Sequence, residues 1–286
     1  MKVPISVIIL TLNEEQNIED CLKSIYGWVG DIFIVDSFSA DRTIEIARKY
    51  TDKIYQHAFE THARQFDWAV QNANIQTEWV LRLDADERIS PGLKEELLAN
   101  LPGIDKSITG IYVRRKVFFM GKWIRHGGYY PLWLLRIYRP GYAKIEDRFM
   151  DEHIVLLRGM ALALRNDLEE RNQKGLTEWI VKHNDYAARE AVDTVNFTAK
   201  DLINTSLQAS FFGRQALRKR WLKNNIYLRL PLFIRPLLYF AYRYFLLLGF
   251  LEGKEGLIFH FLQGFWYRFL VDAKIYEMRQ RALPRI

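Results

Sequence analysis

Two aspartates, Asp84 and Asp86, stand one residue apart in the stretch WVLRLDADERIS, directly behind an almost apolar run at residues 79–83. In an extended segment, side chains two residues apart point the same way, so both carboxylates would face one space. Two carboxylates held close together repel each other unless a cation or a proton lies between them. Mn²⁺ or Mg²⁺ with oxygen ligands meets this need and commonly shares such a site with substrate phosphates. We therefore predict a divalent metal at Asp84 and Asp86.

A solvated acidic turn is the alternative for this D-x-D pair, because about one such pair is expected by chance in a chain of this length. The position of the pair favours a ligand site. Open α/β sheets bind their ligands at the carboxyl ends of their strands, which is where these two aspartates are expected to lie.

Strand and helix patterns alternate through the first third of the chain, before and after these aspartates. This alternation predicts an α/β fold, with a mostly parallel sheet flanked by helices. In this first third, strands are expected at 5–10, 31–36, 53–56 and 79–83, and helices at about 15–28, 43–49 and 63–70. Further along the chain, shorter strands are expected at 110–160, and helices from 176 to the end.

Polar residues also follow the first two predicted strands, in TLNEEQNI and VDSFSADRT. Neighbouring carboxyl ends of parallel strands are where a nucleotide would bind. Asp36 could accept a hydrogen bond from a base or a ribose hydroxyl, whereas Ser39 and Asp41 could equally cap the next helix. The chain has no G-x-G-x-x-G after its first strand and no G-x-x-x-x-G-K-[ST], which argues against a dehydrogenase or a P-loop enzyme.

Four blocks of the chain resemble, in order and spacing, those of family 2 glycosyltransferases: PISVIILTLNEEQNIEDCLKSI, IFIVDSFSADRTIEIA, ARQFDWAV and WVLRLDADERIS. The resemblance covers most of the chain and is strongest to the lipopolysaccharide-core and O-antigen glucosyltransferase-like subgroup. It implies a GT-A fold and an inverting transfer of a hexose from a UDP-sugar. The implied acceptor is a lipid-linked saccharide.

The resemblance also implies roles for individual residues. Arg64 would lie near the diphosphate, Asp84 would touch ribose or metal, and Asp86 would bind the metal that bridges the phosphates. A metal and an arginine would stabilise the charge that the leaving diphosphate gains. Phe66 and Asp67 depart from the pattern, since many relatives have an asparagine there. The nucleoside pocket would be lined by Thr11, Asn13, Glu14 and Asp36. Ser39 is a further candidate for binding the nucleotide-sugar, with helix capping as its alternative role.

Inversion at the sugar carbon needs a general base on the side opposite the diphosphate. The block EDRFMDEHIVL resembles the acceptor-side block of the family, and aligned in this way Glu152 is the expected base, with Asp151 as the alternative. Arg136 could bind a donor or acceptor phosphate or form a surface salt bridge. The loop HGGYYP at 126–131 is expected to be mobile and to lie near the acceptor.

The C-terminal quarter carries all the excess positive charge. Residues 214–286 hold 14 Lys and Arg against 4 Asp and Glu, whereas residues 1–213 hold 27 against 30. We therefore expect a catalytic domain at 1–213 and a basic, aromatic, amphipathic helical tail at 214–286. Its apolar run at 227–253 is interrupted by residues such as Arg235 and Arg243, which argues against a spanning helix. Basic and aromatic residues among leucines are typical of helices that lie in the headgroup plane.

An anionic membrane surface is the expected partner of this tail, at the cytoplasmic face of the inner membrane, with peripheral and salt-sensitive binding. Nucleic acid is the other partner that basic charge suggests, but none is expected here. Packing of the tail on the catalytic domain, or on a second copy in a homo-oligomer, stays open. The single cysteine, Cys21, is typical of a reducing compartment.

Two other functions compete with glycosyl transfer. A metal-dependent nucleotidyltransferase would share the acidic pair and the nucleotide pocket, but it would also need basic residues at the first strand–helix turn, where TLNEEQN offers acids. A non-catalytic membrane adaptor with the same fold would not depend on Asp86.

Overall fold

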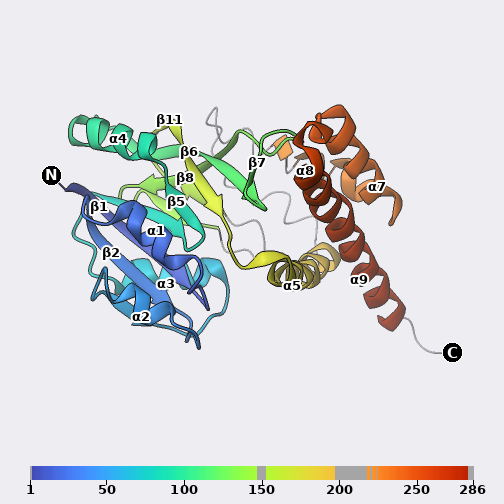
Figure 1. The fold of residues 1–286 in the computed structure, drawn as a ribbon, viewed down its shortest axis with the longest axis horizontal. Coiled ribbons are helices and arrows are strands. Elements are labelled where there is room, and N and C mark those ends of the chain that lie inside the picture. Colours follow the sequence, from blue (N-terminus) through green and yellow to red (C-terminus); the bar gives the residue numbers. More distant parts are fainter. Residues whose placement is uncertain (1, 147–152, 197–217, 220, 224, 283–286) are drawn as a thin grey trace. The chain divides into compact units, whose positions relative to one another are not determined.

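The computed structural model describes residues 2–146, 153–196, 218–219, 221–223 and 225–282 (Figure 1). The chain forms two compact units. Unit 1 holds the described residues of 2–118 and 131–173, and unit 2 holds those of 119–130 and 174–282. The candidate bases Asp151 and Glu152, and the domain boundary expected at residue 213, lie outside the described residues.

Four parallel strands form the first half of the sheet of unit 1, in the spatial order β3-β2-β1-β4. The chain leaves β1 for β2 and β3 on one side and then returns to β4 on the other. The strand order therefore reverses between β1 and β4, which is where open α/β sheets bind ligands. The four strands are β1 (Val3–Thr11), β2 (Val29–Asp36), β3 (Ile54–Gln56) and β4 (Trp79–Asp84).

Beyond β4 the sheet becomes mixed, in the order β8-β6-β11-β5, with β8 antiparallel to β4. A separate pair of antiparallel strands is formed by β9 and β10. The expected α/β fold with a helix-flanked sheet is confirmed. These strands are β5 (Glu87–Ile89), β6 (Ile108–Phe119), β8 (Leu132–Tyr138), β9 (Ala143–Ile145), β10 (Ile154–Leu156) and β11 (Met160–Arg171).

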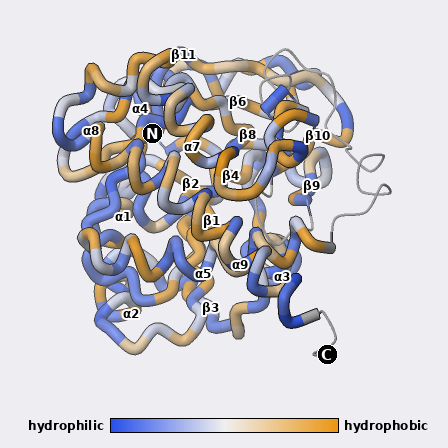
Figure 2. Tube along the Cα trace, turned by 90° about the vertical axis from the view of Figure 1, so that its right-hand side faces the viewer, coloured by the Kyte–Doolittle hydropathy of each residue, from blue (hydrophilic) through white to orange (hydrophobic). Residues whose placement is uncertain are grey.

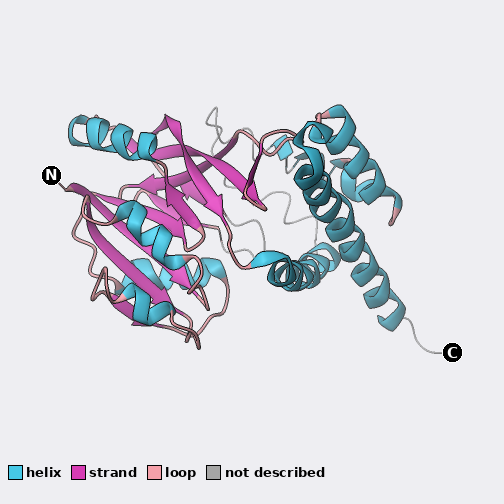
Figure 3. Ribbon diagram, viewed as in Figure 1, coloured by secondary structure: helices cyan, strands magenta, loops and turns pink. Residues whose placement is uncertain are grey.

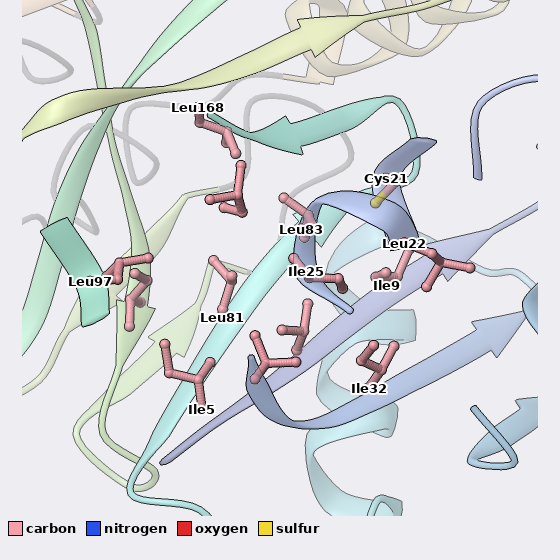
Figure 4. Packing of buried hydrophobic residues seen from close by; sticks show 14 of the residues in the cluster. Ile5, Ile9, Cys21, Leu22, Ile25, Ile32, Leu81, Leu83, Leu97 and Leu168 are labelled. Carbon is pink, nitrogen blue, oxygen red and sulfur yellow. The ribbon is translucent and has the colours of Figure 1, made fainter. Parts of the chain in front are cut away.

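The strand residues alternate between two apolar layers, one on each face of the sheet. On one face Ile9 and Leu83 pack with Leu22 and other residues of α1, and α4 covers the same layer (Figure 4). On the other face Ile8 packs with Phe66 of α3. This two-residue alternation is why both faces of these strands are apolar in sequence. The helices of unit 1 are α1 (Ile18–Ile25), α2 (Thr43–Ala47), α3 (His62–Asn72), α4 (Pro91–Asn100) and η1 (Leu101–Gly103).

The described elements of unit 2 are helices except for β7 (Lys122–Ile124) (Figure 3). Ala187 and Ala191 of α5 pack against Val271 and Ile275 of α9, so the helix before the tail shares a core with the tail. No described helix combines the length and the apolarity needed to cross a bilayer. The helices are α5 (Gly175–Asn196), η3 (Tyr227–Arg229), α7 (Ile234–Ala241), η4 (Tyr242–Leu246), η5 (Gly249–Glu252), α8 (Gly253–His260), η6 (Phe261–Trp266) and α9 (Tyr267–Ala282).

The Gly-rich loop expected to be mobile is held within unit 2. The backbone carbonyl of Gly127 accepts a hydrogen bond from Arg243 Nε at 2.7 Å. The ring of Tyr129 packs edge-on against Phe259, with a centroid distance of 4.6 Å. The partners of Gly127 and Tyr129 thus come from helices more than 100 residues later in the chain. The mobility of the loop stays a prediction.

Candidate active site

The carboxyl ends of β1, β2 and β4 bring Thr11, Asp36 and Asp84 to one edge of the sheet. Thr11 is paired in register with Asp36, and Leu10 is paired with Asp84. Because the three strands are parallel neighbours, the loops that follow them leave the sheet on the same side. Three residues predicted from distant parts of the sequence therefore end their strands at the place where the strand order reverses.

Asp36 is the centre of a hydrogen-bond network at this edge. It is fully buried, and its Oδ1 accepts hydrogen bonds from the hydroxyls of Thr11 at 2.8 Å and Ser39 at 2.5 Å. Its Oδ2 accepts from the backbone N–H of Ser39 at 2.8 Å. Asp36 thus links the end of β1 to the loop after β2. Its contact with a nucleoside stays a prediction.

The loops after β1 and β2 are also held together by side chains that bond to backbone groups. Asn13 has a left-handed backbone, with φ of 53°, and its Oδ1 accepts from the N–H of Ala40 at 2.8 Å. The N–H groups of Asn13 and Glu14 donate to the hydroxyls of Ser39 and Thr43, at 2.8 and 2.7 Å. A non-glycine residue in the left-handed region is typical of functional loops that the surrounding structure constrains.

A second cluster surrounds Asp84. Arg136 Nη2 donates to Asp84 Oδ2 at 2.8 Å and to Glu87 Oε1 at 2.6 Å. Glu87 Oε2 also accepts from the backbone N–H of Asp84 at 2.9 Å. Arg136 and Glu87 are buried, so the prediction of a surface salt bridge for Arg136 is wrong. Arg136 is instead a buried arginine of β8 that joins the end of β4 to the start of β5.

The charges of this cluster act in opposite directions on its two carboxyl groups. Partial burial opposes ionisation of Asp84, but the adjacent Arg136 and Arg82 lower its pKa well below the usual range for aspartate. Burial, together with the Asp84 carboxylate, raises the pKa of Glu87 above the usual range for glutamate. The arginines therefore favour the charged form of Asp84, whereas burial favours the protonated form of Glu87.

Asp86 lies in a turn between β4 and β5, not in an extended segment. The expectation that Asp84 and Asp86 point the same way because of strand geometry is therefore wrong in its premise. Asp86 is half-buried, and its Oδ2 accepts from Asn172 Nδ2 at 3.1 Å. Its backbone carbonyl accepts from the N–H of Arg171 at 2.8 Å.

Arg64 lies in the first turn of α3, where Nη1 pairs with Glu60 Oε2 at 2.6 Å on the exposed side of the helix. Its expected position near a diphosphate stays a prediction. His62, two residues earlier, adds to the charges that lower the pKa of Asp84. From the same helix, the buried Gln65 donates to Ser37 Oγ at 3.1 Å and to the backbone carbonyl of His57 at 3.0 Å. The first turns of α3 are thus tied to the ends of β2 and β3.

The donor set suits a divalent metal that takes most of its ligands from substrate and water. Asp86 offers a half-buried carboxylate whose Oδ2 meets a neutral amide, while Asp84 is already paired with Arg136. The described residues contain no group of three or more His, Cys, Asp or Glu side chains placed to hold a metal. Mg²⁺ and Mn²⁺ sites with one or two carboxylates and substrate phosphates do not need such a group.

Sequence reasoning missed three participants of this site. Glu87 was visible beside the aspartates, but nothing in the sequence showed that it is buried against Arg136. Asn172 contacts Asp86 although the two residues are 86 positions apart, and no local sequence pattern predicts this contact. Gln65 is buried in α3, and its only signal was a polar residue on the apolar face of that helix.

Comparisons with known proteins agree with this architecture. The lipopolysaccharide core biosynthesis glycosyltransferase LpsC of Rhizobium meliloti is 27% identical over 304 residues, covering 100% of this chain and 97% of that protein. An uncharacterized glycosyltransferase of Rickettsia bellii is 31% identical over 93 residues, which is 32% of this chain and 31% of that protein.

Among solved structures, residues 1–349 of S. aureus TarS in complex with UDP-GlcNAc superpose with a TM-score of 0.50. The sequence identity is 16%, and the match covers 100% of this chain and 93% of that one. This likeness confirms the GT-A fold. The model of the glycosyl transferase family 2 matches residues 6–171, a segment that contains both clusters described above. The chain therefore belongs to glycosyl transferase family 2.

Proposed function

We propose that this chain is a metal-dependent inverting glycosyltransferase that moves a hexose from a UDP-sugar to a lipid-linked saccharide. The observation that carries the proposal is the convergence of Thr11, Asp36 and Asp84 at the edge where the strand order reverses between β1 and β4. A nucleoside would lie over the loops after β1 and β2, and a diphosphate would lie toward Asp84 and Asp86.

A bound Mn²⁺ or Mg²⁺ would supply positive charge to the diphosphate of the leaving UDP. Asp86 would be its principal protein ligand, with Asp84 oriented toward the ribose or the same metal. Arg136 holds Asp84 in place, so the position of this carboxylate does not depend on a ligand. Arg64, in the first turn of α3, would add a positive charge near the diphosphate.

Glu152 would act as the general base in the proposed reaction, with Asp151 as the alternative. The base would take the proton of the acceptor hydroxyl, and the oxygen of that hydroxyl would bond to the sugar C1. The bond from C1 to the diphosphate breaks at the same centre, so the configuration inverts. Family membership and the acceptor-side sequence block support this assignment.

Similarity to a lipopolysaccharide core glycosyltransferase over the whole chain supports a lipid-linked acceptor in cell-surface polysaccharide synthesis. Residues 1–213 would carry catalysis, and the basic tail at 214–286 would hold the enzyme peripherally at the cytoplasmic face of the membrane. The packing of α5 against α9 would then connect the tail to the last helix before it.

Isothermal titration of UDP, GDP and TDP, each with and without Mn²⁺ or Mg²⁺, tests the donor assignment. We expect UDP to bind best and to need the metal. Incubation with UDP-hexoses and lipid-linked saccharide extracts should then release UDP. Release of hexose 1-phosphate from the UDP-hexose, or of pyrophosphate when UTP replaces it, would indicate a nucleotidyltransferase. Absence of any nucleotide binding would indicate a non-catalytic adaptor.

A further inference from the structure

The arginines that interrupt the apolar run of the tail do not lie on its surface. Arg235 is 3% exposed, and its Nε donates to Asp272 Oδ1 of α9 at 2.8 Å. The other oxygen of Asp272 accepts from the backbone N–H of Phe233 at 2.8 Å. The Arg235 charge is therefore neutralised within unit 2.

Arg243 and Glu252, the other charged residues between 230 and 253, are buried as well, at 6% and 4% exposure. Arg243 bonds to the carbonyl of Gly127, and its guanidinium lies 3.8 Å from the centre of the Tyr129 ring. Glu252 Oε1 accepts from the backbone N–H and Nδ1 of His126, at 2.7 and 2.6 Å. Every charged side chain of residues 230–253 thus turns inward.

The outward side chains of the same segment are almost all apolar or aromatic. Leu246 is 74% exposed, and the trace of α7 is coloured mainly as hydrophobic (Figure 2). Exposed apolar patches of this kind mark sites of contact with a partner or a membrane. The exposed large hydrophobic residues are Phe233, Ile234, Leu237, Leu238, Tyr242, Phe245, Leu246, Leu248, Phe250 and Leu251.

The chain reverses its direction in the middle of this segment. α7 packs against η6, and η4 packs against η5 and α8, so the two arms form a helical hairpin. The reversal lies at Leu248, which has a left-handed backbone with φ of 59°. The exposed leucines and phenylalanines on both sides of Leu248 form the tip of the hairpin, which we define as residues 245–251.

We propose that the hairpin formed by α7–η4 and α8–η6 inserts its tip into the acyl chains of one membrane leaflet, an inference that rests on the membrane location proposed above. Residues 230–253, which include the tip, have no charged side chain on their surface, so their contact with hydrocarbon leaves no ion unsolvated. Exposed basic residues stand at both ends of this segment, Arg229 before it and Lys254 after it. They would meet anionic headgroups while the tip lies deeper.

This arrangement predicts a different salt response from that of a helix held on the surface by its basic residues. The strongest contribution would come from apolar burial, which salt does not screen. Arg229 and Lys254 would add only a salt-sensitive preference for anionic lipid. Binding should therefore persist in about 1 M NaCl, where charges are screened beyond about 3 Å.

The single cysteine of the chain makes a direct test simple. Cys21 is fully buried, so a cysteine introduced on the surface is the one that a thiol-reactive fluorophore should label. Leu246→Cys carries a nitrobenzoxadiazole label at the tip, and Val181→Cys carries it on α5, at a position that is 53% exposed. With phosphatidylcholine vesicles, we expect a blue shift and stronger emission at position 246 and no change at 181. Equal spectra at both positions, with and without vesicles, would overturn the proposal.

Charge substitutions at the same two positions give a second test. Leu246→Glu should weaken flotation of the full-length chain with vesicles by about tenfold or more, since apolar burial is lost and a charge enters the interface. Val181→Glu should leave flotation unchanged. Salt-sensitive binding that Leu246→Glu does not alter would show that surface charge alone holds the protein.

A covered tip is the remaining outcome that would overturn the proposal. If the wild-type chain sediments as a dimer and Leu246→Glu as a monomer, the tip is an interface between two copies. UDP titration of each variant separates this inference from the proposed function. If the tip does not insert but UDP still binds, only the proposal of an inserted hairpin is contradicted. If the wild-type chain does not bind UDP, the proposed function is contradicted.

Discussion

Arg136 Nη2 lies 2.8 Å from Asp84 Oδ2, and this contact joins two neighbouring antiparallel strands, β8 and β4, at the edge where the candidate site lies. The same nitrogen lies 2.6 Å from Glu87 Oε1. One buried guanidinium thus holds Asp84 at the candidate site and also binds Glu87. The site is therefore coupled to the stability of unit 1.

Replacing Arg136 with Met should destabilise unit 1 by about 2–4 kcal/mol, because removing one partner of a buried ion pair leaves the other uncompensated. We place the value below the upper end of that class because Asp84 is partly exposed and Glu87 can take up a proton. Urea unfolding near pH 7 measures the change. UDP affinity should fall as well, since Asp84 loses its anchor.

Arg64→Met is the matched control for this prediction. The pair between Arg64 and Glu60 is exposed, and such pairs change stability by about 0.5 kcal/mol or less. Equal destabilisation by the two variants would mean that the buried contact of Arg136 has no special importance.

Asp86→Asn should abolish the metal dependence of UDP binding while the protein stays folded. The amide oxygen of asparagine can still accept the hydrogen bond from Asn172, so the turn between β4 and β5 keeps its contact. Asp52→Asn, at an exposed position before β3, serves as the control. An Asp86→Asn protein that binds UDP with unchanged Mn²⁺ dependence would contradict the metal assignment.

Glu152→Gln should lower turnover by about 10²-fold or more and leave the affinity for the UDP-sugar nearly intact. Glutamine keeps the size of glutamate and most of its hydrogen bonding but cannot take a proton from the acceptor. Steady-state turnover and donor titration together test this. If Asp151→Asn loses turnover and Glu152→Gln does not, the base is Asp151.

His260 should make unit 2 less stable as the pH falls from 6.5 to 4. Burial, together with the charge of Arg243, lowers the pKa of His260 to about 4, while the acid Glu252 and the basic His126 also face it. The unfolded chain, with a histidine pKa of about 6.5, binds the proton more readily in this range. The contribution of neutral His260 to the free energy of unfolding is therefore complete above about pH 6.5. It is lost progressively as the pH falls, by about 3 kcal/mol at most.

His260→Gln removes this titration. Thermal unfolding at several pH values between 4 and 7 should show a shallower loss of stability for the variant than for the wild type. A slope identical to that of the wild type would show that His260 stays unprotonated for another reason or does not titrate with unfolding.

Local pattern in the sequence was enough to predict the parallel half of the sheet and the strand ends at which the candidate site lies. The apolar runs of β1, β2 and β4 end in Thr11, Asp36 and Asp84, because a buried strand must become polar where it leaves the core. The period of a strand and the end of its apolar run can be read from neighbouring residues, so the sequence shows where each strand ends. The four blocks that resemble family 2 glycosyltransferases then supplied the order and the expected chemistry.

Only the tertiary structure decided which charges face the site and which are buried. Arg136 meets Asp84 across 52 positions and Asn172 meets Asp86 across 86, and such contacts depend on which strands become neighbours. Arg235 and Arg243 looked like surface charges in the sequence, since a basic residue among leucines is usually solvated. Their burial depends on Asp272 and Gly127, which other segments of unit 2 bring within hydrogen-bond distance. A sequence shows that a charge is present, but its partner and its exposure are set by packing between distant segments.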